Sequence, residues 1–166
     1  MRIAIVSDTH KRWEPVARAI KAEEKMDYLL FLGDHAEDGH LLAKELAIPH
    51  AIVQGNCDYS GIDGMEKILD LEGIKIFICH GHVYQVKEKL DTLIYHGKEV
   101  GADVVCFGHT HIAMDIEQDD IRLINPGTAG KPHILEKNGS WGILEIQTCQ
   151  ENHKKTIKYE KKILPL

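Results

Sequence analysis

Five short apolar runs in this chain each end beside a residue type that can bind a metal ion, and this pattern constrains the fold more than any other feature. The runs span residues 2–6, 28–32, 50–54, 75–79 and 103–107. After the first residue of each run nearly every side chain is apolar, which is typical of strands that are buried on both faces of a sheet. The chain is therefore predicted to be an α/β protein built around buried strands with polar ends.

Helices are predicted between these strands. Apolar residues recur at helical spacing in residues 14–25, and residues 37–47 and 85–100 are two further predicted helices. Strands that alternate with helices favour a parallel sheet in which the helices serve as crossover connections.

Later segments of the chain indicate antiparallel pairing as well. Glu72-Gly73 is a hairpin signal within residues 66–79, so the sheets are expected to be mixed. Further turns are predicted at Asp119-Asp120 and Asn138-Gly139. The remaining predicted strands cover residues 112–118, 121–124, 132–137, 141–147 and 154–163.

The lysines of the last predicted strand are expected at exposed positions. They are Lys154, Lys155, Lys158, Lys161 and Lys162. We interpret them as protection of an edge strand against pairing with another chain, rather than as a binding patch.

Composition limits the class of protein. With 166 residues, 43% hydrophobic and 28% charged, the chain is expected to form one domain over residues 1–166. Its 20 basic and 26 acidic residues give a net charge of -6, which does not indicate a nucleic-acid or anionic-membrane surface. The first apolar run is too short for a signal segment or a membrane span, so a cytoplasmic location is expected.

The four cysteines do not form a recognisable metal or redox motif. Cys57, Cys79, Cys106 and Cys149 lie far apart, with no CxxC pair, which argues against a zinc ribbon or a thioredoxin-like site. Cys79 and Cys106 lie within apolar runs and are interpreted as reduced core residues.

The residues that follow the five runs are the candidate site. They are Asp8 and His10, Gly33-Asp34, Gly55-Asn56, His80-Gly81-His82, and Gly108-His109-Thr110-His111. Any one of them has an ordinary structural interpretation, such as a helix N-cap, a turn residue or a partly buried histidine. Ligands of open α/β sheets bind beyond the carboxyl ends of the strands, so the five loops together are expected to converge on one site.

The donor types indicate divalent metal ions. Carboxylate and amide oxygens suit Mn²⁺ and Mg²⁺, while imidazoles suit Zn²⁺, Fe, Ni²⁺ and Mn²⁺. The seven candidate ligands, which exceed the needs of one ion, are Asp8, His10, Asp34, Asn56, His80, His109 and His111. Two metals about 3.5 to 4 Å apart form the usual arrangement for displacement at phosphorus. His109 and His111, two positions apart, are expected to reach one metal each.

The ordered motifs DTH, GDH, GNCD, CHGH and GHTH resemble the signature of the calcineurin-like metallophosphoesterase superfamily. The match covers residues 6–130 and includes NPGTAG at 125–130. The short chain is most similar to the small bacterial and archaeal phosphodiesterases of that superfamily. This resemblance implies two packed mixed β-sheets flanked by helices, the sandwich of that superfamily.

The resemblance also implies which residues hold each ion. Asp8, His10, Asp34 and His111 are the implied ligands of the first metal. Those of the second are Asp34, Asn56, His80 and His109, with Asp34 as the bridge. The implied activity is hydrolysis of a small phosphate diester by in-line attack of a hydroxide that bridges the metals. Mn²⁺ is the expected metal, ahead of Ni²⁺, Fe and Zn²⁺.

Asn56, Cys57 and His80 are the candidate catalytic residues. Asn56 could donate its amide N–H to a phosphoryl oxygen as well as bind metal. Many members of the superfamily have a histidine where this chain has Cys57. A thiol with an ordinary pKa of about 8.5 can donate a proton but carries no positive charge, so modest turnover and a preference for good leaving groups are expected.

Other residues keep two interpretations. Asp58 either orients a site histidine or forms a turn, and His35 is a candidate partner of the ligands. Lys11 and Arg12 either contact the distal part of a substrate or are solvated loop charges. His82 lies on a site loop but matches no implied ligand.

The alternatives in function are a phosphomonoesterase or nucleotide phosphatase, and a catalytically weak metal-binding scaffold for protein partners. The sequence does not name the substrate or the native metal. It also leaves a homodimer open.

Overall fold

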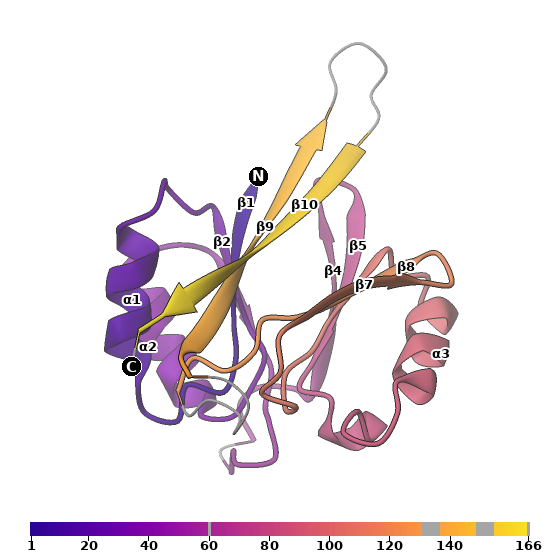
Figure 1. The fold of residues 1–166 in the computed structure, drawn as a ribbon, viewed down its shortest axis with the longest axis horizontal. Coiled ribbons are helices and arrows are strands. Elements are labelled where there is room, and N and C mark those ends of the chain that lie inside the picture. Colours follow the sequence, from indigo (N-terminus) through magenta and orange to yellow (C-terminus); the bar gives the residue numbers. More distant parts are fainter. Residues whose placement is uncertain (60, 131–136, 149–154, 166) are drawn as a thin grey trace.

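Two five-stranded sheets form the core of the protein (Figure 1). A computed structural model describes residues 1–59, 61–130, 137–148 and 155–165. The first sheet contains β1 (Arg2–Val6), β2 (Tyr28–Phe31), β3 (His50–Ile52), β9 (Gly139–Thr148) and β10 (Lys155–Leu164). The second contains β4 (Glu66–Leu71), β5 (Ile74–Cys79), β6 (Val104–Cys106), β7 (Met114–Gln118) and β8 (Ile121–Asn125). The orders are β10-β9-β1-β2-β3 and β4-β5-β6-β8-β7, which confirms the expected pair of mixed sheets.

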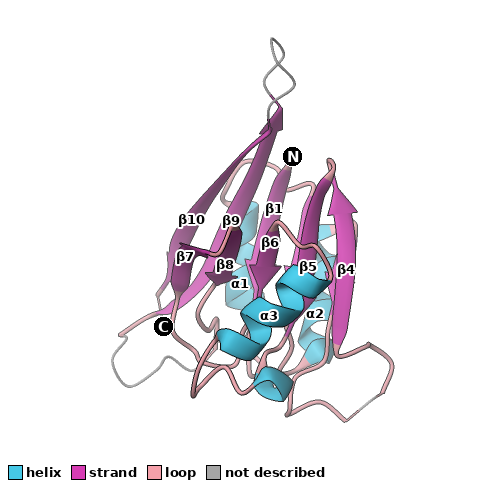
Figure 2. Cartoon of the chain, turned by 90° about the vertical axis from the view of Figure 1, so that its right-hand side faces the viewer, coloured by secondary structure: helices cyan, strands magenta, loops and turns pink. Residues whose placement is uncertain are grey.

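Helices cover the outer face of each sheet. The helices are α1 (Trp13–Lys21), α2 (Ala36–Leu46) and α3 (Asp91–Glu99), with a short 3₁₀ turn, η1 (His82–Tyr84). Figures 1 and 2 show α1 and α2 on one side of the sandwich and α3 on the other. No helix in the described ranges is long and apolar enough to span a membrane.

The strand β1 shows why the apolar runs lack polar alternation. Ile3 and Ile5 belong to the core between the two sheets. Ala4 and Val6 belong to the core between the first sheet and its helices. Because successive side chains of a strand point to opposite faces, both faces must be apolar, and all four of these residues are buried.

Parallel pairing brings the carboxyl ends of the strands to one edge of each sheet. In the first sheet β1 pairs with β2 and β2 with β3, all in parallel. In the second, β5, β6 and β8 are parallel neighbours. The loops that carry the candidate ligands leave β1, β2, β3, β5 and β6 at these edges.

Two of the three predicted turns are confirmed. Glu72-Gly73 joins β4 to β5 with φ angles of 54° and 69°, and Asp119-Asp120 joins β7 to β8 with φ angles of 57° and 65°. Two successive left-handed residues match the twist of hairpin strands.

The Asn138-Gly139 turn prediction is wrong. Gly139 is the first residue of β9 and pairs with Leu164 of β10. A Cβ at Gly139 would lie 3.1 Å from Thr128 O, so the position requires a small residue for close backbone approach rather than for a turn. The predicted strand at 132–137 lies outside the described residues, except for Lys137, which forms a bend.

The predicted helix at 85–100 is shorter than expected and begins at Asp91. Gln85 ends the preceding 3₁₀ turn with a left-handed φ of 54°, a conformation that interrupts a right-handed helix.

The strand β10 lies at the edge of its sheet, as predicted. Lys158 is exposed, whereas Lys155, Lys161 and Lys162 are half-buried, so the prediction of exposure is wrong for these three; Lys154 lies outside the described residues. Lys162 pairs with Glu160 and with Glu23 of the segment that follows α1, so this lysine also ties the edge strand to the body of the protein.

Candidate metal centre

Backbone contacts bring together the loops that leave the two sheets. The loop after β1 contacts the loop after β2, because Asp8 N–H donates to Gly33 O at 3.1 Å. The loop after β6 contacts the end of β5, because Gly108 N–H donates to His80 O at 3.0 Å. The two sheets are joined where His80 Nδ1 lies 2.7 Å from Leu32 O. The convergence predicted from the sequence is therefore present.

Asp8 is a fully buried carboxylate with one oxygen held in place. Its Oδ2 accepts hydrogen bonds from the Ser7 hydroxyl and from His109 N–H. Its Oδ1 lies 3.0 Å from His111 Nε2. Burial raises the pKa of Asp8, but His111, His80 and Ser7 outweigh burial and lower the pKa below its ordinary value. Asp8 is therefore an ionised carboxylate at neutral pH.

Asp34 lies at the centre of the site and is 3% exposed. Its Oδ1 accepts the backbone N–H of Cys57 at 2.9 Å and lies 3.4 Å from His80 Nε2. Gly55 makes this approach possible, because a Cβ at that position would lie 2.2 Å from Asp34 Oδ1.

Four side chains place their ligand atoms within 4.8 Å of one another: Asp8, His10, Asp34 and His111. The Nε2 atoms of His10 and His111 face each other at 3.5 Å. Burial lowers the pKa of His10, which favours the neutral imidazole that binds metal. Two carboxylates and two imidazoles fit a divalent cation, and they are the four ligands predicted for the first metal.

His80 is a fully buried histidine with an unpartnered ring nitrogen. A carbonyl oxygen can only accept, so the contact with Leu32 O places a proton on Nδ1, and in the neutral imidazole the lone pair then lies on Nε2. In the part of the chain that the structure describes, Nε2 has no hydrogen-bond partner, although it lies 3.4 Å from Asp34 Oδ1. A lone pair that faces a carboxylate oxygen in a buried site fits a cation between the two groups.

His109 lies beside His80, with their ring centres 5.0 Å apart. Burial, together with His80 and Lys87, lowers the pKa of His109 to about 4. Its imidazole is therefore neutral at physiological pH. The structure thus brings together three of the four residues predicted for the second metal, namely Asp34, His80 and His109.

Asn56, the fourth of these residues, has an exposed side chain. Its Nδ2 donates to Cys57 Sγ at 3.5 Å. Burial and the Asp34 carboxylate raise the pKa of the Cys57 thiol to about 11. Cys57 is therefore a neutral thiol at physiological pH, and its backbone N–H makes the contact with Asp34.

The site loops contain a concentration of left-handed residues other than glycine. Their φ angles lie between 45° and 70°, and they are Asp8, His10, Lys11, Asp34, His35, His109 and His111. Each such conformation costs about 1–3 kcal/mol, and such residues cluster at functional sites. The rings of His35 and His10 pack edge to face, with their centres 5.3 Å apart, so His35 contacts one of the candidate ligands.

Asp38 supports the site and was not identified from the sequence. Its Oδ2 accepts the Thr9 hydroxyl at 2.6 Å and the Lys11 N–H at 2.8 Å, which fixes the loop that carries His10. In the sequence Asp38 is one acidic residue in the first turn of a helix, and no local signal separates it from a solvated one.

Asn125 also supports the site. Its Nδ2 donates to Gly108 O at 2.8 Å and to Thr110 Oγ1 at 3.1 Å, and its Oδ1 accepts the Gly127 N–H at 2.9 Å. The NPGTAG segment is part of the resemblance to the superfamily, but only the tertiary structure shows that Asn125 holds the loop of His109 and His111.

Asp58 forms a turn and joins two site loops. Its carboxylate accepts the N–H groups of Ala36 at 2.7 Å and Gly55 at 2.8 Å. His82 lies beside both His80 and His109, with ring centres 5.4 and 6.1 Å away. Its Nδ1 is buried and has no hydrogen-bond partner among the described residues. Cys57, Cys79 and Cys106 are free cysteines.

The sequence also matches known proteins. The probable metallophosphoesterase YsnB of Bacillus subtilis (strain 168) is 34% identical over 160 residues, which cover 96% of this chain and 90% of that protein. The phosphodiesterase MJ0936 of Methanocaldococcus jannaschii is 30% identical over 148 residues, which cover 76% of this chain and 83% of that one.

Solved structures share the fold. A structure described as a novel archaeal phosphodiesterase has a TM-score of 0.75 and 25% identity, over 99% of this chain and 100% of the other. Vps29 of Entamoeba histolytica in complex with zinc has a TM-score of 0.74 and 20% identity, over 99% of each chain. Residues 1–149 match the calcineurin-like phosphoesterase superfamily domain, and the chain therefore belongs to that superfamily of metal-dependent phosphoesterases.

Proposed function

We propose that this protein is a phosphodiesterase that uses two divalent metal ions to hydrolyse a small phosphate diester. The observation that carries the proposal is the meeting of Asp8, His10, Asp34 and His111, whose ligand atoms all lie within 4.8 Å. The phosphodiesterases among its relatives support the choice of reaction.

Two ligand sets share Asp34. The first ion would be held by Asp8, His10, Asp34 and His111, and the second by Asp34, Asn56, His80 and His109. Asp34 suits the shared position, because it belongs to the four-donor group and also lies 3.4 Å from the unpartnered His80 Nε2. We assign Mn²⁺ to both positions, since a mixed carboxylate and imidazole shell suits a borderline divalent metal.

When bound, two such cations neutralise phosphoryl oxygens and lower the pKa of water for in-line attack at phosphorus. The protein orients the side chains that would bind the metals. The Ser7 hydroxyl and His109 N–H fix one oxygen of Asp8. The Leu32 carbonyl fixes the His80 tautomer. Such contacts position ligands before a metal arrives.

Asn56 and Cys57 are assigned to the side of the departing group. The amide of Asn56 can donate to a phosphoryl oxygen from its exposed position. Cys57 is a neutral thiol with a pKa raised to about 11, so it brings no positive charge to a developing alkoxide. The enzyme is therefore expected to prefer diesters with good leaving groups, such as aryl esters.

Two alternative functions lead to other results in the assay described below. A phosphomonoesterase or nucleotide phosphatase would use the same metals on a dianionic substrate. A protein-interaction scaffold is suggested by the fold shared with Vps29 proteins. We favour the enzyme over the scaffold because every expected type of ligand is present, and because the donor atoms of four of the candidate residues lie within 4.8 Å of one another. The cytoplasmic location and the homodimer stay predictions.

The test is hydrolysis of bis-p-nitrophenyl phosphate by protein that has been stripped with a chelator, before and after addition of Mn²⁺. The monoester p-nitrophenyl phosphate is measured in parallel. Faster, metal-restored cleavage of the diester is the expected result. Faster cleavage of the monoester would support the phosphatase, and metal binding without turnover on either ester would support the scaffold.

A further inference from the structure

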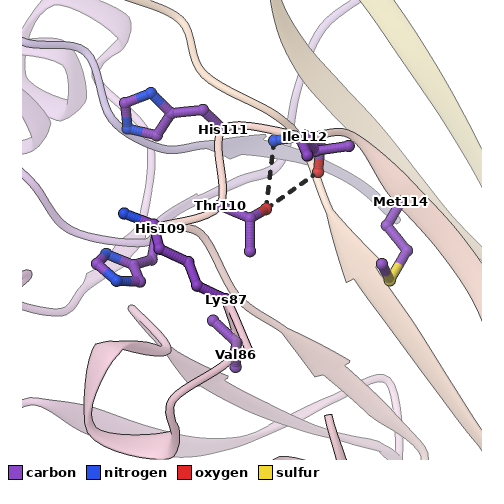
Figure 3. A pocket seen from close by; sticks show the side chains of 7 residues that line it. All are labelled: Val86, Lys87, His109, Thr110, His111, Ile112 and Met114. Carbon is purple, nitrogen blue, oxygen red and sulfur yellow. Dashed lines mark hydrogen bonds between the residues drawn. The ribbon is translucent and has the colours of Figure 1, made fainter. Parts of the chain in front are cut away.

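A cavity of about 440 Å³ lies beside the candidate metal centre (Figure 3). His109 and His111 form part of its lining, and Val86 and Lys87 line it from the segment between η1 and α3. His111 is one of the four clustered donors, so the cavity adjoins the site where the phosphorus of a substrate would be bound.

The volume exceeds the needs of a phosphate group. Small-molecule sites have volumes of about 300–1,000 Å³, so this cavity can hold an organic group of the size of an aromatic ring or a nucleoside. The apolar residues Val86, Ile112 and Met114 supply much of its wall. Val86 is buried, and Met114 is half-buried at the start of β7.

The hydroxyl of Thr110, although it lines the cavity, is engaged within its own loop. It donates to Ile112 O at 3.3 Å and accepts the Ile112 N–H at 3.2 Å, as the dashed lines of Figure 3 show. It also accepts from Asn125 Nδ2. Thr110 therefore shapes the loop rather than offering its hydroxyl to a ligand.

Lys87 is the cationic side chain of this cavity. It is exposed, and no ion pair joins it to a carboxylate of the described residues. Figure 3 shows it beside His109. In a chain of net charge -6, a lysine without a carboxylate partner at the edge of an apolar cavity is suited to an anionic group of a ligand.

The assignment of Asn56 and Cys57 to the departing group leaves the cavity for the substituent that stays on phosphorus. Asn56 and Cys57, which we assign to the departing group, do not line it. An in-line displacement separates the leaving group from the attacking oxygen and leaves the retained substituent to one side.

We propose that this cavity binds the retained substituent of the diester, and that Lys87 contacts a second anionic group on it. The substrate class is a phosphodiester with a retained apolar ring system, of nucleoside size, that carries a further acidic group. This inference rests on the proposed function and specifies the substrate of the same site.

The test compares esters that share p-nitrophenolate as the leaving group. Methyl p-nitrophenyl phosphate has a small retained group, thymidine 5′-(p-nitrophenyl) phosphate has a large one, and the 3′-phosphorylated form of the latter adds a second anion. With Mn²⁺ present, kcat/KM is expected to be about tenfold higher for the thymidine ester than for the methyl ester, mainly through a lower KM. The 3′-phosphate is expected to lower KM by a further factor of about five.

Two variants examine the two parts of the cavity. Met114→Asp places a carboxylate in the apolar wall and should abolish the preference for the thymidine ester over the methyl ester. The matched control, Met65→Asp, changes an exposed methionine that does not line this cavity and should keep the preference. Lys87→Ala should remove only the advantage of the 3′-phosphate, whereas Lys89→Ala, on the same segment, should retain it.

The outcomes separate this inference from the proposed function. Hydrolysis of all three esters with equal kcat/KM, or a preference that survives Met114→Asp, would overturn the inference and leave the phosphodiesterase standing. No metal-dependent hydrolysis of even the methyl ester would overturn both.

Discussion

Left-handed backbone occurs at both ends of the strands of this protein, but for different reasons. At the amino ends of β5 and β8, the turns Glu72-Gly73 and Asp119-Asp120 are exposed and close two-residue hairpins. At the carboxyl ends, Asp8 and Asp34 adopt similar φ angles while buried. The hairpin geometry explains the first set locally.

The carboxyl-end residues are held by contacts between segments far apart in the sequence. Asp8 accepts the N–H of His109, and Asp34 accepts the N–H of Cys57. A conformation that costs free energy and is kept by tertiary contacts indicates selection for the position of the side chain. The left-handed residues at the amino ends thus allow the chain to reverse direction, whereas those at the carboxyl ends position the side chains of the candidate metal centre.

The largest expected effect comes from Asp34→Asn. The change removes the charge shared by both ligand sets while keeping the side-chain shape, so metal affinity and diester hydrolysis should each fall by about a hundredfold or more. The measurements are metal stoichiometry and kcat/KM with Mn²⁺. Asp120→Asn makes the same chemical change at the opposite end and should alter neither quantity. Equal activity of the two variants would contradict the role of Asp34.

Gly55→Ala is expected to have the next largest effect. The new methyl group would lie 2.2 Å from Asp34 Oδ1 and must displace that carboxylate. The free energy of unfolding should fall by about 1–3 kcal/mol, as measured by denaturant titration. Metal affinity should fall by about tenfold or more.

Gly64→Ala is the matched control for Gly55→Ala. Its nearest contact would be Glu66 O at 3.5 Å, an ordinary distance, so stability should change by less than about 0.5 kcal/mol. If both glycine variants behaved alike, the close approach of Gly55 to Asp34 would have no functional meaning.

Variants of Cys57 distinguish the role of its backbone N–H from the role of its thiol. Its N–H holds Asp34, and any residue can supply that N–H, so Cys57→Ala should keep both metals. The rate with p-nitrophenyl esters should change by less than about threefold, because a thiol with a pKa of about 11 is a weak acid and this leaving group needs no proton. Cys57→His should keep the metals and raise the rate on alkyl esters. A loss of about a hundredfold in Cys57→Ala would show that the thiol acts as the proton donor.

The smallest expected effect is at the hairpin end. Asp120→Gly removes the steric cost of a left-handed residue with φ of 65° and should raise the free energy of unfolding by about 0.5–1 kcal/mol. Metal affinity should stay unchanged.

His35→Gly, at a φ of 70° in the site, should instead weaken metal binding, because it removes the ring that packs against His10. Thermal unfolding and metal titration of both variants make the comparison.

Much of the fold follows from short patterns in the sequence. The apolar runs predict strands buried on both faces, and the hairpins at Glu72-Gly73 and Asp119-Asp120 follow from local turn chemistry. The interpretation of Gly139 as a turn residue was wrong, because its role depends on Thr128 and Ala129, which approach it only in the folded protein.

The candidate site could be predicted only where its residues follow a local sequence pattern. The position of Asp8 and Asp34 at the ends of buried strands is a sequence feature. Asp38 and Asn125 act through hydrogen bonds to loops distant in the sequence, so no local pattern identifies them. The cavity at Met114 likewise depends on how the loop after β6 packs beside Val86 and Lys87.

The proposed phosphodiesterase activity depends on two metal ions that share Asp34 as a ligand. The most direct test is titration of chelator-stripped protein with Mn²⁺, in which bound metal and the hydrolysis of bis-p-nitrophenyl phosphate are measured on the same samples. The account predicts two ions bound per chain, with hydrolysis that rises as the second ion binds. Full hydrolysis without metal, or with only one ion bound, would contradict it.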